Sequence, residues 1–366
     1  MKYLFINSVY GIRSTGKIIS NLCHELIKQG NECVVAYGRQ SIEDDIKQIQ
    51  IGTKMDYIAH AGIARVLDNQ GLCSKRATKD FLEKIDLYKP DVLWLHNIHG
   101  YYINYEMLFK WIKSHPEIEV RWTLHDCWAF TGHCSHFTLA KCDKWKTHCV
   151  NCNQKKEYPA SYVCDASKSN FDKKKEAFTG VKNLTIVTPS KWLADLVKES
   201  FLKEYPVIVV NNTINGEVFK PTPSSFRKEY GLENKYILLG VAVSWDYTKG
   251  FQDMLKLRNE LDDSFVIVLV GLTKDQLKHL PSGIIGIERI KEQRQLAGIY
   301  TEADVFINPT HQDNYPTVNL EARACGTPVV TYDVGGSPES AGYEHVVKEN
   351  DIKALVAEIN IILRKV

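Results

Sequence analysis

The sequence predicts an α/β protein with two domains, each built on a parallel sheet. Short apolar runs alternate with segments of helical periodicity along the chain, a pattern typical of parallel sheets. With 366 residues, the chain is long for one domain and comfortable for two. Residues 211–225, rich in Asn, Thr and Pro, indicate a linker between residues 1–215 and 226–366.

Composition and charge argue against several classes of protein. The hydrophobic fraction is 44% and the charged fraction 25%, average values for a folded soluble domain. The formal net charge is +2, and no basic run or stripe indicates a nucleic-acid partner. No apolar stretch reaches 18 residues, and the start MKYLFINSVYGIRSTGK lacks the pattern of a signal peptide. We therefore expect a cytoplasmic protein.

Six apolar runs predict the strands of the first domain. They are residues 3–6, 33–37, 92–95, 120–124, 184–187 and 207–210. A helix is expected over residues 17–29, with apolar side chains on one face and Gly30 after its end. Ser190 is expected to cap a helix between the last two strands.

The second domain repeats the pattern without internal sequence repeats. Strands are expected at residues 236–241, 265–270, 284–287, 305–307 and 328–332. Helices are expected after Lys249 and over residues 293–300, 316–325 and 351–362.

Residues 303–340, ADVFINPTHQDNYPTVNLEARACGTPVVTYDVGGSPES, contain two turns from strand to helix. Such turns lie where ligands bind in parallel sheets, because helix amino termini offer free N–H groups to an anion. Gly335 and Gly336 would let the backbone approach a phosphate closely. Glu321 and Glu339 could accept hydrogen bonds from sugar hydroxyls. Phosphate beside hydroxyls describes a nucleotide or a nucleotide sugar.

Asp313 and Glu321, with seven residues between them, resemble the E-x(7)-E motif of the retaining glycosyltransferases of family 4. The run EARACGTPVV from Glu321, followed by the glycine pair, is similar to that family's signature. An isolated pair of carboxylates would indicate only solvated helix charges; the full string favours a functional interpretation. The resemblance implies two Rossmann-like domains facing each other across a cleft, the GT-B architecture, and bacterial polysaccharide assembly.

The resemblance also implies roles in the second domain. The family's first carboxylate contacts the donor sugar and its second the ribose; here these are Asp313, one methylene shorter than the usual Glu, and Glu321. Asn314, beside Asp313, is assigned to the same site. Lys249 matches the family's diphosphate-binding Lys, whereas the expected Arg falls near the non-basic Ser244. One ammonium can still stabilise the leaving nucleotide without a metal.

Residues 8–16 form the expected turn after the first strand. The spacing of Gly11 and Gly16 lacks the Ser or Thr that follows in the phosphate-binding loop of ATPases. In family 4 the corresponding loop lies under the donor diphosphate, so the resemblance implies a binding role for Gly16. Arg13 is a second candidate that could replace the missing Arg.

Two turns after strands carry histidines, His99 in LHNIHGYY and His125 with Asp126 in TLHDCW. A histidine at a strand end is often only a hydrogen-bonded surface residue. Both turns, however, fall at the carboxyl edge of the predicted sheet, where sites form. The resemblance implies that His125 contacts the donor sugar near the reacting carbon, and we assign His99 and Asp126 to substrate binding.

Six of the ten cysteines crowd into residues 127–164, together with three histidines. Disulfides are disfavoured in a cytoplasmic chain, so the cluster indicates metal. Cys149 and Cys152 form a C-x-x-C, and Cys134 and Cys142 could complete a tetrahedral structural zinc site. Because only one C-x-x-C is present, disulfides and free thiols stay open.

The predicted function is retaining, metal-independent hexosyl transfer from a UDP- or GDP-sugar to a saccharide acceptor, free or lipid-linked, in capsule, exopolysaccharide or lipopolysaccharide synthesis. No cofactor is expected for catalysis. Two alternatives stay open: a nucleotide-sugar epimerase or hydrolase of the same architecture, and a non-catalytic binding subunit. Residues 168–175, KSNFDKKK, are a candidate for peripheral contact with the inner face of the membrane, although a solvated charge run is the simpler interpretation.

Overall fold

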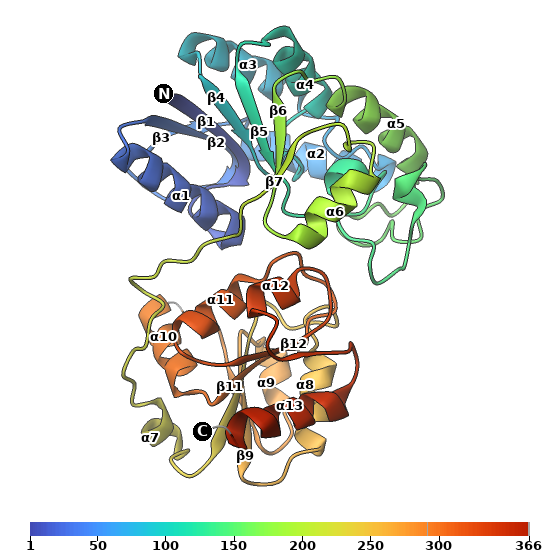
Figure 1. Cartoon of the computed structure of the whole chain (residues 1–366). Helices are drawn as coiled ribbons and strands as arrows, with labels where there is room; N and C mark the ends of the chain where they lie inside the picture. Colours follow the sequence, from blue (N-terminus) through green and yellow to red (C-terminus); the bar gives the residue numbers. More distant parts are fainter. Residues whose placement is uncertain (291, 365–366) are drawn as a thin grey trace. The chain divides into compact units, whose positions relative to one another are not determined.

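The computed structural model describes residues 1–290 and 292–364, and the chain divides into two compact units, Met1–Asn211 and Asn212–Val366 (Figure 1). Each unit has one sheet in which all paired strands run parallel. The α/β prediction with two parallel sheets is therefore confirmed. Residues 212–225 contain neither helix nor strand. No helix among the described residues is both long and apolar enough to cross a membrane.

The sheet of the first unit has seven strands in the order β3-β2-β1-β4-β5-β6-β7. The strands are β1 (Lys2–Val9), β2 (Glu32–Gln40), β3 (Lys47–Gln50), β4 (Val92–Leu95), β5 (Glu119–Thr123), β6 (Leu184–Thr188) and β7 (Val207–Val209). Six of them match predicted runs. The edge strand β3 was not predicted, because its sequence KQIQ has no apolar run and none of its residues is fully buried.

The main helices of the first unit are α1 (Arg13–Lys28), α2 (Lys54–Leu67), α3 (Lys75–Tyr88), α4 (Tyr105–Ser114), α5 (Ser167–Phe178) and α6 (Lys191–Glu199). Ser190 caps α6 as expected, because its Oγ accepts a hydrogen bond from the Leu193 N–H at 3.1 Å. The Cys-rich segment between β5 and α5 contains only the short 3-10 helices η1 (Trp128–Phe130) and η2 (Lys144–Lys146).

The helix α1 begins four residues earlier than predicted. Gly16 therefore lies in its first turn rather than in a loop, and it is buried. The N–H of Gly11, which has φ +70°, donates to the Gly16 carbonyl at 3.1 Å. A side chain at Gly16 would meet this backbone at 3.1 Å, so the missing Cβ lets the turn fold back on the helix.

The sheet of the second unit has six strands in the order β10-β9-β8-β11-β12-β13. The strands are β8 (Tyr236–Val241), β9 (Phe265–Val270), β10 (Ile284–Ile287), β11 (Val305–Asn308), β12 (Val329–Tyr332) and β13 (Val346–Val347). The helices are α7 (Phe226–Tyr230), α8 (Phe251–Asn259), α9 (Lys274–Lys278), α10 (Gln293–Glu302), α11 (Thr317–Ala324), α12 (Ser337–Ala341) and α13 (Ile352–Arg364). The five predicted strands are confirmed, and β13 is an addition.

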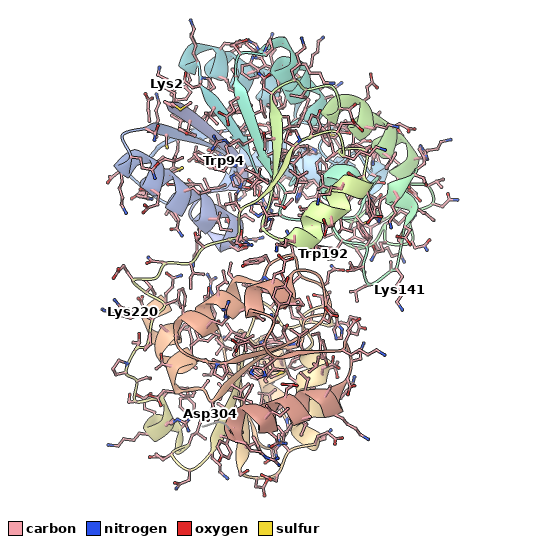
Figure 2. All side chains as sticks on the ribbon, viewed as in Figure 1. Lys2, Trp94, Lys141, Trp192, Lys220 and Asp304 are labelled. Carbon is pink, nitrogen blue, oxygen red and sulfur yellow. The ribbon has the colours of Figure 1, made fainter. Side chains whose placement is uncertain are left out.

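Apolar clusters cover both faces of each sheet. Polar anchors fix strands within them. In the first unit, the buried Trp94 donates from Nε1 to Thr123 Oγ1 at 2.8 Å. In the second, Asp304 Oδ2 accepts from the Ile237 N–H at 2.6 Å and so sets β11 beside β8. Figure 2 labels Trp94 and Asp304 among the side chains.

Each sheet has a point where the chain changes the direction in which it adds strands. This point lies between β1 and β4 in the first unit and between β8 and β11 in the second. The loops that leave the carboxyl ends of these strands diverge there, which opens a crevice where ligands bind in open α/β sheets. The topology thus locates one candidate site on each unit.

Candidate active site

Lys249 and Asp313 form an ion pair at the direction change of the second sheet. Lys249 Nζ lies 2.6 Å from Asp313 Oδ2, and the two side chains keep 35% and 20% exposure. Lys249 follows β8 and Asp313 follows β11, which are neighbouring strands. The structure therefore brings together two of the predicted catalytic residues and leaves both accessible to a ligand.

The loops that carry this pair are tied to each other by main-chain contacts. The carbonyl of Thr248 accepts from the His311 N–H at 2.8 Å and from Thr310 Oγ1 at 3.0 Å. Next to Lys249, Gly250 has φ +74°, and a Cβ there would lie 2.1 Å from the Pro309 carbonyl oxygen. Only glycine allows this approach, so the sequence Lys249-Gly250 fixes the lysine beside the Asp313 loop.

The glycine turn packs directly against the Asp313 backbone. Gly335 has φ +58°, and a Cβ at this position would lie 2.0 Å from the Asp313 carbonyl oxygen. The N–H of Gly336 donates to the same oxygen at 3.3 Å. Gly336 also precedes α12, whose first turn contains Glu339. The predicted site residues Asp313, Gly335 and Gly336 thus form one local structure, with Asn314 buried next to Asp313.

Glu321 lies on α11 and is oriented by a tyrosine that the sequence did not single out. The hydroxyl of Tyr300, on α10, donates to Glu321 Oε2 at 3.0 Å. Burial, together with this carboxylate, raises the pKa of Tyr300 well above its ordinary value, so the phenol stays a donor. One carboxylate oxygen of Glu321 is therefore held by the phenol, and a carboxylate can accept hydrogen bonds from several donors at once.

Asn319 fixes α11 against α12. Its amide is fully buried; Nδ2 donates to Ser340 Oγ at 2.8 Å and to Ser337 Oγ at 3.2 Å, and Oδ1 accepts from Asn308 Nδ2 at 2.8 Å. These bonds set the helix that carries Glu321 relative to the glycine turn. Neither Asn319 nor Tyr300 carried a signal in the sequence, because their importance comes from contacts between distant elements.

A buried histidine clamp lies under the Lys249 loop. The ring of His311 faces a carboxylate on each side, Asp253 Oδ2 2.8 Å from Nε2 and Glu349 Oε1 2.7 Å from Nδ1, with 1% of its side chain exposed. The ring thus connects the two carboxylates through its two nitrogens. Tyr247 stacks on this ring with centroids 4.8 Å apart. The clamp joins α8, the β11 loop and the segment before α13.

The first unit presents a pair of histidines after the neighbouring strands β4 and β5, next to its own direction change. His96 Nδ1 and His125 Nε2 are 2.9 Å apart, and the two rings stack with centroids 5.2 Å apart. Burial lowers the pKa of His96 well below its ordinary value, and burial lowers that of His125 to about 4. Both rings are therefore neutral at pH 7, and one of the two facing nitrogens donates to the other.

His99 and Asp126 lie next to this pair. His99 Nε2 is 3.1 Å from Asp126 Oδ2, and His99 Nδ1 is 3.1 Å from the Tyr158 hydroxyl. Burial opposes ionisation of Asp126, but the neighbouring His99, His136 and the Trp128 N–H outweigh it and lower the pKa to about 2. Asp126 is therefore a carboxylate that orients His99, and the structure groups the three predicted residues His99, His125 and Asp126.

The other predicted residues of the first unit lie at the start of α1. Arg13 is exposed at the first helical position, and Gly16 is buried one turn on. Asn7, which the sequence analysis missed, connects this end of β1 to the histidine turns: its Oδ1 accepts from the Asn97 N–H at 3.2 Å, and its Nδ2 lies 3.4 Å from Thr15 Oγ1. Asn7 is fully buried.

The four cysteines predicted as zinc ligands line one small cavity of about 20 Å³. They are Cys134, Cys142, Cys149 and Cys152, and all ten cysteines of the chain are free thiols. The hydrogen bond between the Cys134 and Cys152 thiols lowers the pKa of Cys152 to about 6. No three Cys, His, Asp or Glu side chains within residues 1–290 and 292–364 are already arranged as a metal site. Figure 2 marks the loop of this segment at Lys141.

His133 lines the same cavity. Its Nδ1 is 2.6 Å from Asp68 Oδ1, both side chains are almost fully buried, and its Nε2 has no hydrogen-bond partner in the described structure. Asp68, at the end of α2, also accepts through Oδ2 from the Ala166 N–H at 2.9 Å and through its carbonyl from Asn170 Nδ2 at 2.6 Å. Asp68 thus joins α2, the Cys-rich segment and α5.

The lysine run at residues 168–175, the candidate for membrane contact, is only partly buried: Lys168 and Lys175 are exposed, whereas Lys174 is not. Lys174 is 1% exposed, and its Nζ donates to the carbonyls of Trp128 at 2.7 Å and Thr131 at 3.0 Å. The ammonium also lies 3.7 Å from the Trp128 ring centroid. Burial lowers its pKa to about 7. This lysine holds the Cys-rich segment on α5, and membrane contact through the exposed lysines of the run stays a prediction.

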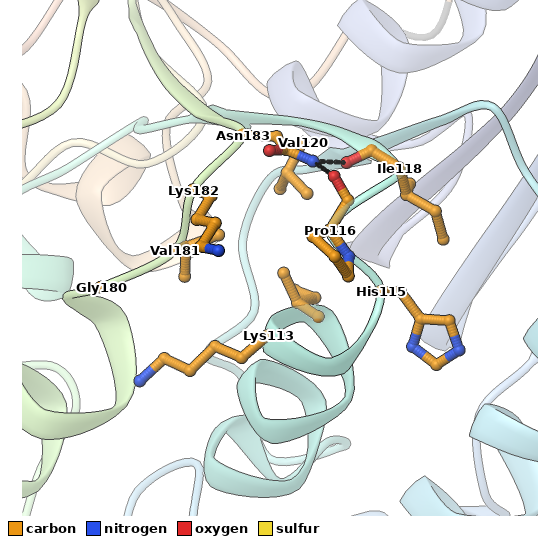
Figure 3. Close-up of a pocket in the computed structure, with 10 residues that line it drawn as sticks. Lys113, His115, Pro116, Ile118, Val120, Gly180, Val181, Lys182 and Asn183 are labelled. Carbon is orange, nitrogen blue, oxygen red and sulfur yellow. Dashed lines mark hydrogen bonds between the residues drawn. The ribbon is translucent and has the colours of Figure 1, made fainter.

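Two further cavities lie at the opposite edge of the first sheet. Figure 3 shows one of about 90 Å³, where Asn183 Nδ2 donates to the carbonyls of Ile118, at 3.0 Å, and Pro116. The second, of about 480 Å³, is lined by residues 179–185 and Pro206. Both are at the amino ends of β5, β6 and β7, away from the edge where parallel sheets form ligand sites.

The fold matches solved enzymes with two Rossmann-like domains. The structure of Anabaena HepE in complex with UDP superimposes with a TM-score of 0.64 at 12% identity, covering 100% of this chain and 90% of that one. The sucrose-phosphate synthase of Thermosynechococcus elongatus gives 0.67 at 15% identity, covering 99% and 90%. The chain therefore has the GT-B fold, as the resemblance implied.

The sequence comparisons place the second unit in a family. Residues 235–365 match the model described as "Glycosyl transferases group 1". The putative colanic acid biosynthesis glycosyl transferase WcaC of Escherichia coli is 26% identical over 252 residues, 66% of this chain and 59% of the relative. The alpha-galactosylglucosyldiacylglycerol synthase of Streptococcus pneumoniae is 26% identical over 178 residues, 43% and 45%. The chain thus spans about half of the length of these relatives, and its second unit is a group 1 glycosyltransferase domain.

Proposed function

We propose that the protein is a retaining glycosyltransferase that moves a sugar from a nucleotide diphosphate sugar to a saccharide acceptor. The observation that carries this proposal is the pair Lys249–Asp313 at the direction change of the second sheet, packed on the Gly335–Gly336 turn. An ammonium there would stabilise the negative charge that develops on the departing diphosphate. Carboxylates around it would bind hydroxyl groups of the same ligand.

In this proposal each residue has one task. Lys249 and the backbone N–H groups of the glycine turn hold the diphosphate, Glu321 binds the ribose, and Asp313 binds the donor sugar. The bond from the anomeric carbon to the diphosphate oxygen breaks while the acceptor oxygen bonds to the same face of that carbon. The proton of the acceptor hydroxyl passes to a diphosphate oxygen, so no protein nucleophile or metal enters the balance.

Substrate-binding roles are also proposed for residues of the first unit, as the resemblance implies. His125, neutral at pH 7 and held by His96, would donate or accept a hydrogen bond at the donor sugar without adding charge. His99 and Asp126 would order the surrounding turn, and Gly16 would let the start of α1 approach the diphosphate. Arg13 is the candidate second cation, since no Arg stands near Ser244. Asn314 and Glu339 would contact the sugar and the nucleotide.

UDP is the favoured nucleotide of the donor. HepE, which shares the fold, was solved with UDP, and GDP is the alternative. Thermal unfolding in the presence of UDP, GDP and their sugars separates the two. A ligand present at about a hundred times its dissociation constant stabilises the folded state by about 2.7 kcal/mol.

The acceptor is proposed to be a saccharide of cell-surface polysaccharide synthesis, either free or linked to a lipid. The relative from Escherichia coli is named for colanic acid biosynthesis and the relative from Streptococcus pneumoniae for a diacylglycerol glycolipid. A lipid-linked acceptor would require peripheral contact with the membrane, at its cytoplasmic face where we expect the protein.

The Cys-rich cavity is proposed to bind a structural zinc ion. The four cysteines and His133 line one cavity, and thiolates are the ligands of closed zinc sites. The His133–Asp68 contact has the form of a carboxylate that orients a histidine near a metal. Modest side-chain rotations would be needed to bring the thiolates together.

Product analysis tests the main proposal. Purified protein is incubated with a UDP-sugar, with and without a saccharide acceptor, and the products are identified by mass and anomeric configuration. A new α-glycoside from an α-linked donor supports retaining transfer. A stereoisomer of the donor sugar without acceptor would instead support the epimerase, which the names of the relatives do not favour. Donor turnover above background excludes a binding subunit.

A further inference from the structure

The helix α2 is apolar on its solvent face as well as on its buried face. The buried face consists of His60, Ala61 and Ala64. The exposed apolar side chains are Met55 (71%), Ile58 (48%), Ile63 (42%), Val66 (46%) and Leu67 (46%). Their spacing places them along one side of the helix over three turns. We refer to these five residues as the α2 stripe.

A segment of the Cys-rich region extends the stripe. The N–H of Tyr162 donates to the Arg65 carbonyl at 2.7 Å, and the N–H of Cys164 donates to the Val66 carbonyl at 2.9 Å. These bonds fix Tyr162 and Val163 at the carboxyl end of α2, where their side chains are 61% and 63% exposed. The apolar surface is therefore held by backbone hydrogen bonds and belongs to two elements distant in sequence.

Three basic residues lie on the two elements that form this surface: Lys54 and Arg65 on α2, and Lys155, whose Nζ donates to the Val163 carbonyl at 3.1 Å. Lys54 and Arg65 are exposed on α2, whose one acidic residue, Asp56, is bound within the amino-terminal capping box. Residues 155–163, KKEYPASYV, add two lysines against one glutamate. The rim of the apolar surface is therefore net positive. A contiguous exposed apolar patch with a polar rim is uncommon on monomers and marks an interaction site.

The charge of the rim decides which partner fits. In a two-fold dimer the same patch faces itself, so Lys54 and Arg65 of two copies would approach one another unfavourably. An anionic lipid surface satisfies both parts of the patch, because aliphatic and tyrosine side chains enter the interface while Lys and Arg meet the headgroups. The surface fits a membrane better than a second copy of the chain.

We propose that the α2 stripe, with Tyr162 and Val163, docks the protein on an anionic lipid surface. Lipid docking rests on the proposed function in one respect only: an enzyme that uses a lipid-linked acceptor meets that acceptor at such a surface. We assign the contact to α2 rather than to residues 168–175, where one of the four lysines, Lys174, is buried.

Vesicle flotation tests the surface directly. The whole chain is mixed with vesicles of phosphatidylethanolamine and phosphatidylglycerol, or of phosphatidylcholine alone. The double variant Ile58→Glu with Ile63→Glu should lose about tenfold or more of the binding to the anionic vesicles, because two anions replace two apolar groups at the lipid interface. A second variant, Lys54→Glu with Lys156→Glu, reverses two positive charges. It should weaken binding to the anionic vesicles, and the binding that remains should vary less with salt concentration.

A matched control is Leu87→Glu, which changes an 85% exposed apolar residue on α3 and should leave binding unchanged. Thermal unfolding of each variant should match the parent, since the changed side chains are exposed. Undiminished flotation of the Ile58→Glu, Ile63→Glu protein would overturn the proposal. The proposal would also be overturned if the parent chain does not bind vesicles and instead forms a dimer, detected by light scattering, that the Ile58→Glu and Ile63→Glu changes dissociate. Transfer to a water-soluble acceptor without vesicles tests the enzyme separately, so either proposal can fail alone.

Discussion

The ammonium of Lys249 contacts the carboxylate of Asp313 at 2.6 Å across 64 residues of sequence. An ammonium has three donors, so Lys249 can hold Asp313 and still offer hydrogen bonds to phosphate oxygens. The pair would then orient both partners: Asp313 keeps the lysine extended over the glycine turn, and the lysine holds the Asp313 carboxylate beside the proposed sugar position. The consequence is that the two residues should act together in donor binding.

Removing the cation should weaken donor binding strongly. We expect Lys249→Met to raise the dissociation constant of the UDP-sugar by about ten- to a hundredfold, because a charge-assisted bond to phosphate is lost. Isothermal titration calorimetry measures the change. Lys274→Met, which alters an exposed lysine of α9, is the matched control and should bind as the parent does. Equal affinity of parent and Lys249→Met would remove the lysine from the phosphate site.

The ribose assignment predicts an effect of charge alone at Glu321. We expect Glu321→Gln to lower donor affinity by about 1.5 to 3 kcal/mol, the range for hydrogen bonds to charged groups, without unfolding the protein. Tyr300→Phe removes the hydroxyl that orients Glu321 and should have a smaller effect in the same direction. If neither variant alters the titration with the UDP-sugar, Glu321 does not bind the donor.

A side chain at Gly335 should damage both stability and the site. Gly335→Ala costs about 1 to 2 kcal/mol for the left-handed backbone, and its Cβ would also displace the Asp313 carbonyl, 2.0 Å away. Gly231 has a similar φ of +65° with no neighbour within 4 Å, so Gly231→Ala supplies the backbone cost alone. Denaturant unfolding should show a larger loss for Gly335→Ala, together with weaker donor binding. Equal losses would mean that the turn yields without strain.

The neutral histidines predict loss of stability in acid. The folded pKa of His125 is about 4, that of His96 is well below its ordinary value, and burial lowers that of His60 to about 4. Between pH 6.5 and 4 the unfolded chain therefore binds protons that these folded histidines do not, so the free energy of unfolding falls as pH falls. Each histidine contributes a slope of at most about 1.4 kcal/mol per pH unit.

Comparison of two variants isolates this contribution. His96→Gln should reduce the slope of stability against pH by about one proton in that range. His24→Gln, at an exposed position of α1, removes a histidine outside the buried pair and serves as the comparison. Denaturant unfolding at several pH values gives both slopes. A slope that His96→Gln does not alter would show that the buried pair takes up its protons in the folded state.

The zinc proposal predicts metal content. Purified protein should contain about one zinc per chain, and Cys149→Ser with Cys152→Ser should lose it together with part of the stability. Cys73→Ser, a half-buried cysteine outside the cavity, should retain the metal. Elemental analysis and thermal unfolding measure the two effects. Metal-free protein with the full stability of the parent would leave the cysteines as free thiols.

Much of the sheet architecture could be predicted because buried parallel strands are short continuous apolar runs. The strands β8, β9 and β10 were predicted to the residue. The edge strand β3 and the helix α2 were not predicted. KQIQ has no apolar run, and α2 is apolar on two opposite faces, which removes the one-sided periodicity that indicates a helix. The feature that hid α2 is the one on which its proposed docking role depends.

The site was predicted in part. Lys249, Asp313 and Gly335 follow neighbouring strands, so their proximity follows from the order of elements along the chain. The positions of the partner residues that hold them do not follow from this order. Tyr300 supports Glu321, and His311 lies between Asp253 and Glu349; these contacts join elements whose relative rotation is set by packing, which leaves no local pattern in the sequence.

Asp68 also determines which parts of the first unit should unfold together. Its carboxylate and carbonyl bind His133, Ala166 and Asn170, and nearly all of its side chain is buried. Opening any one of these elements would expose an uncompensated polar group at the other two, so α2, the Cys-rich segment and α5 should unfold locally as one cooperative group. Amide hydrogens of these elements should then exchange with a common protection, and cleavage within the Cys-rich segment should release the helix that carries the α2 stripe.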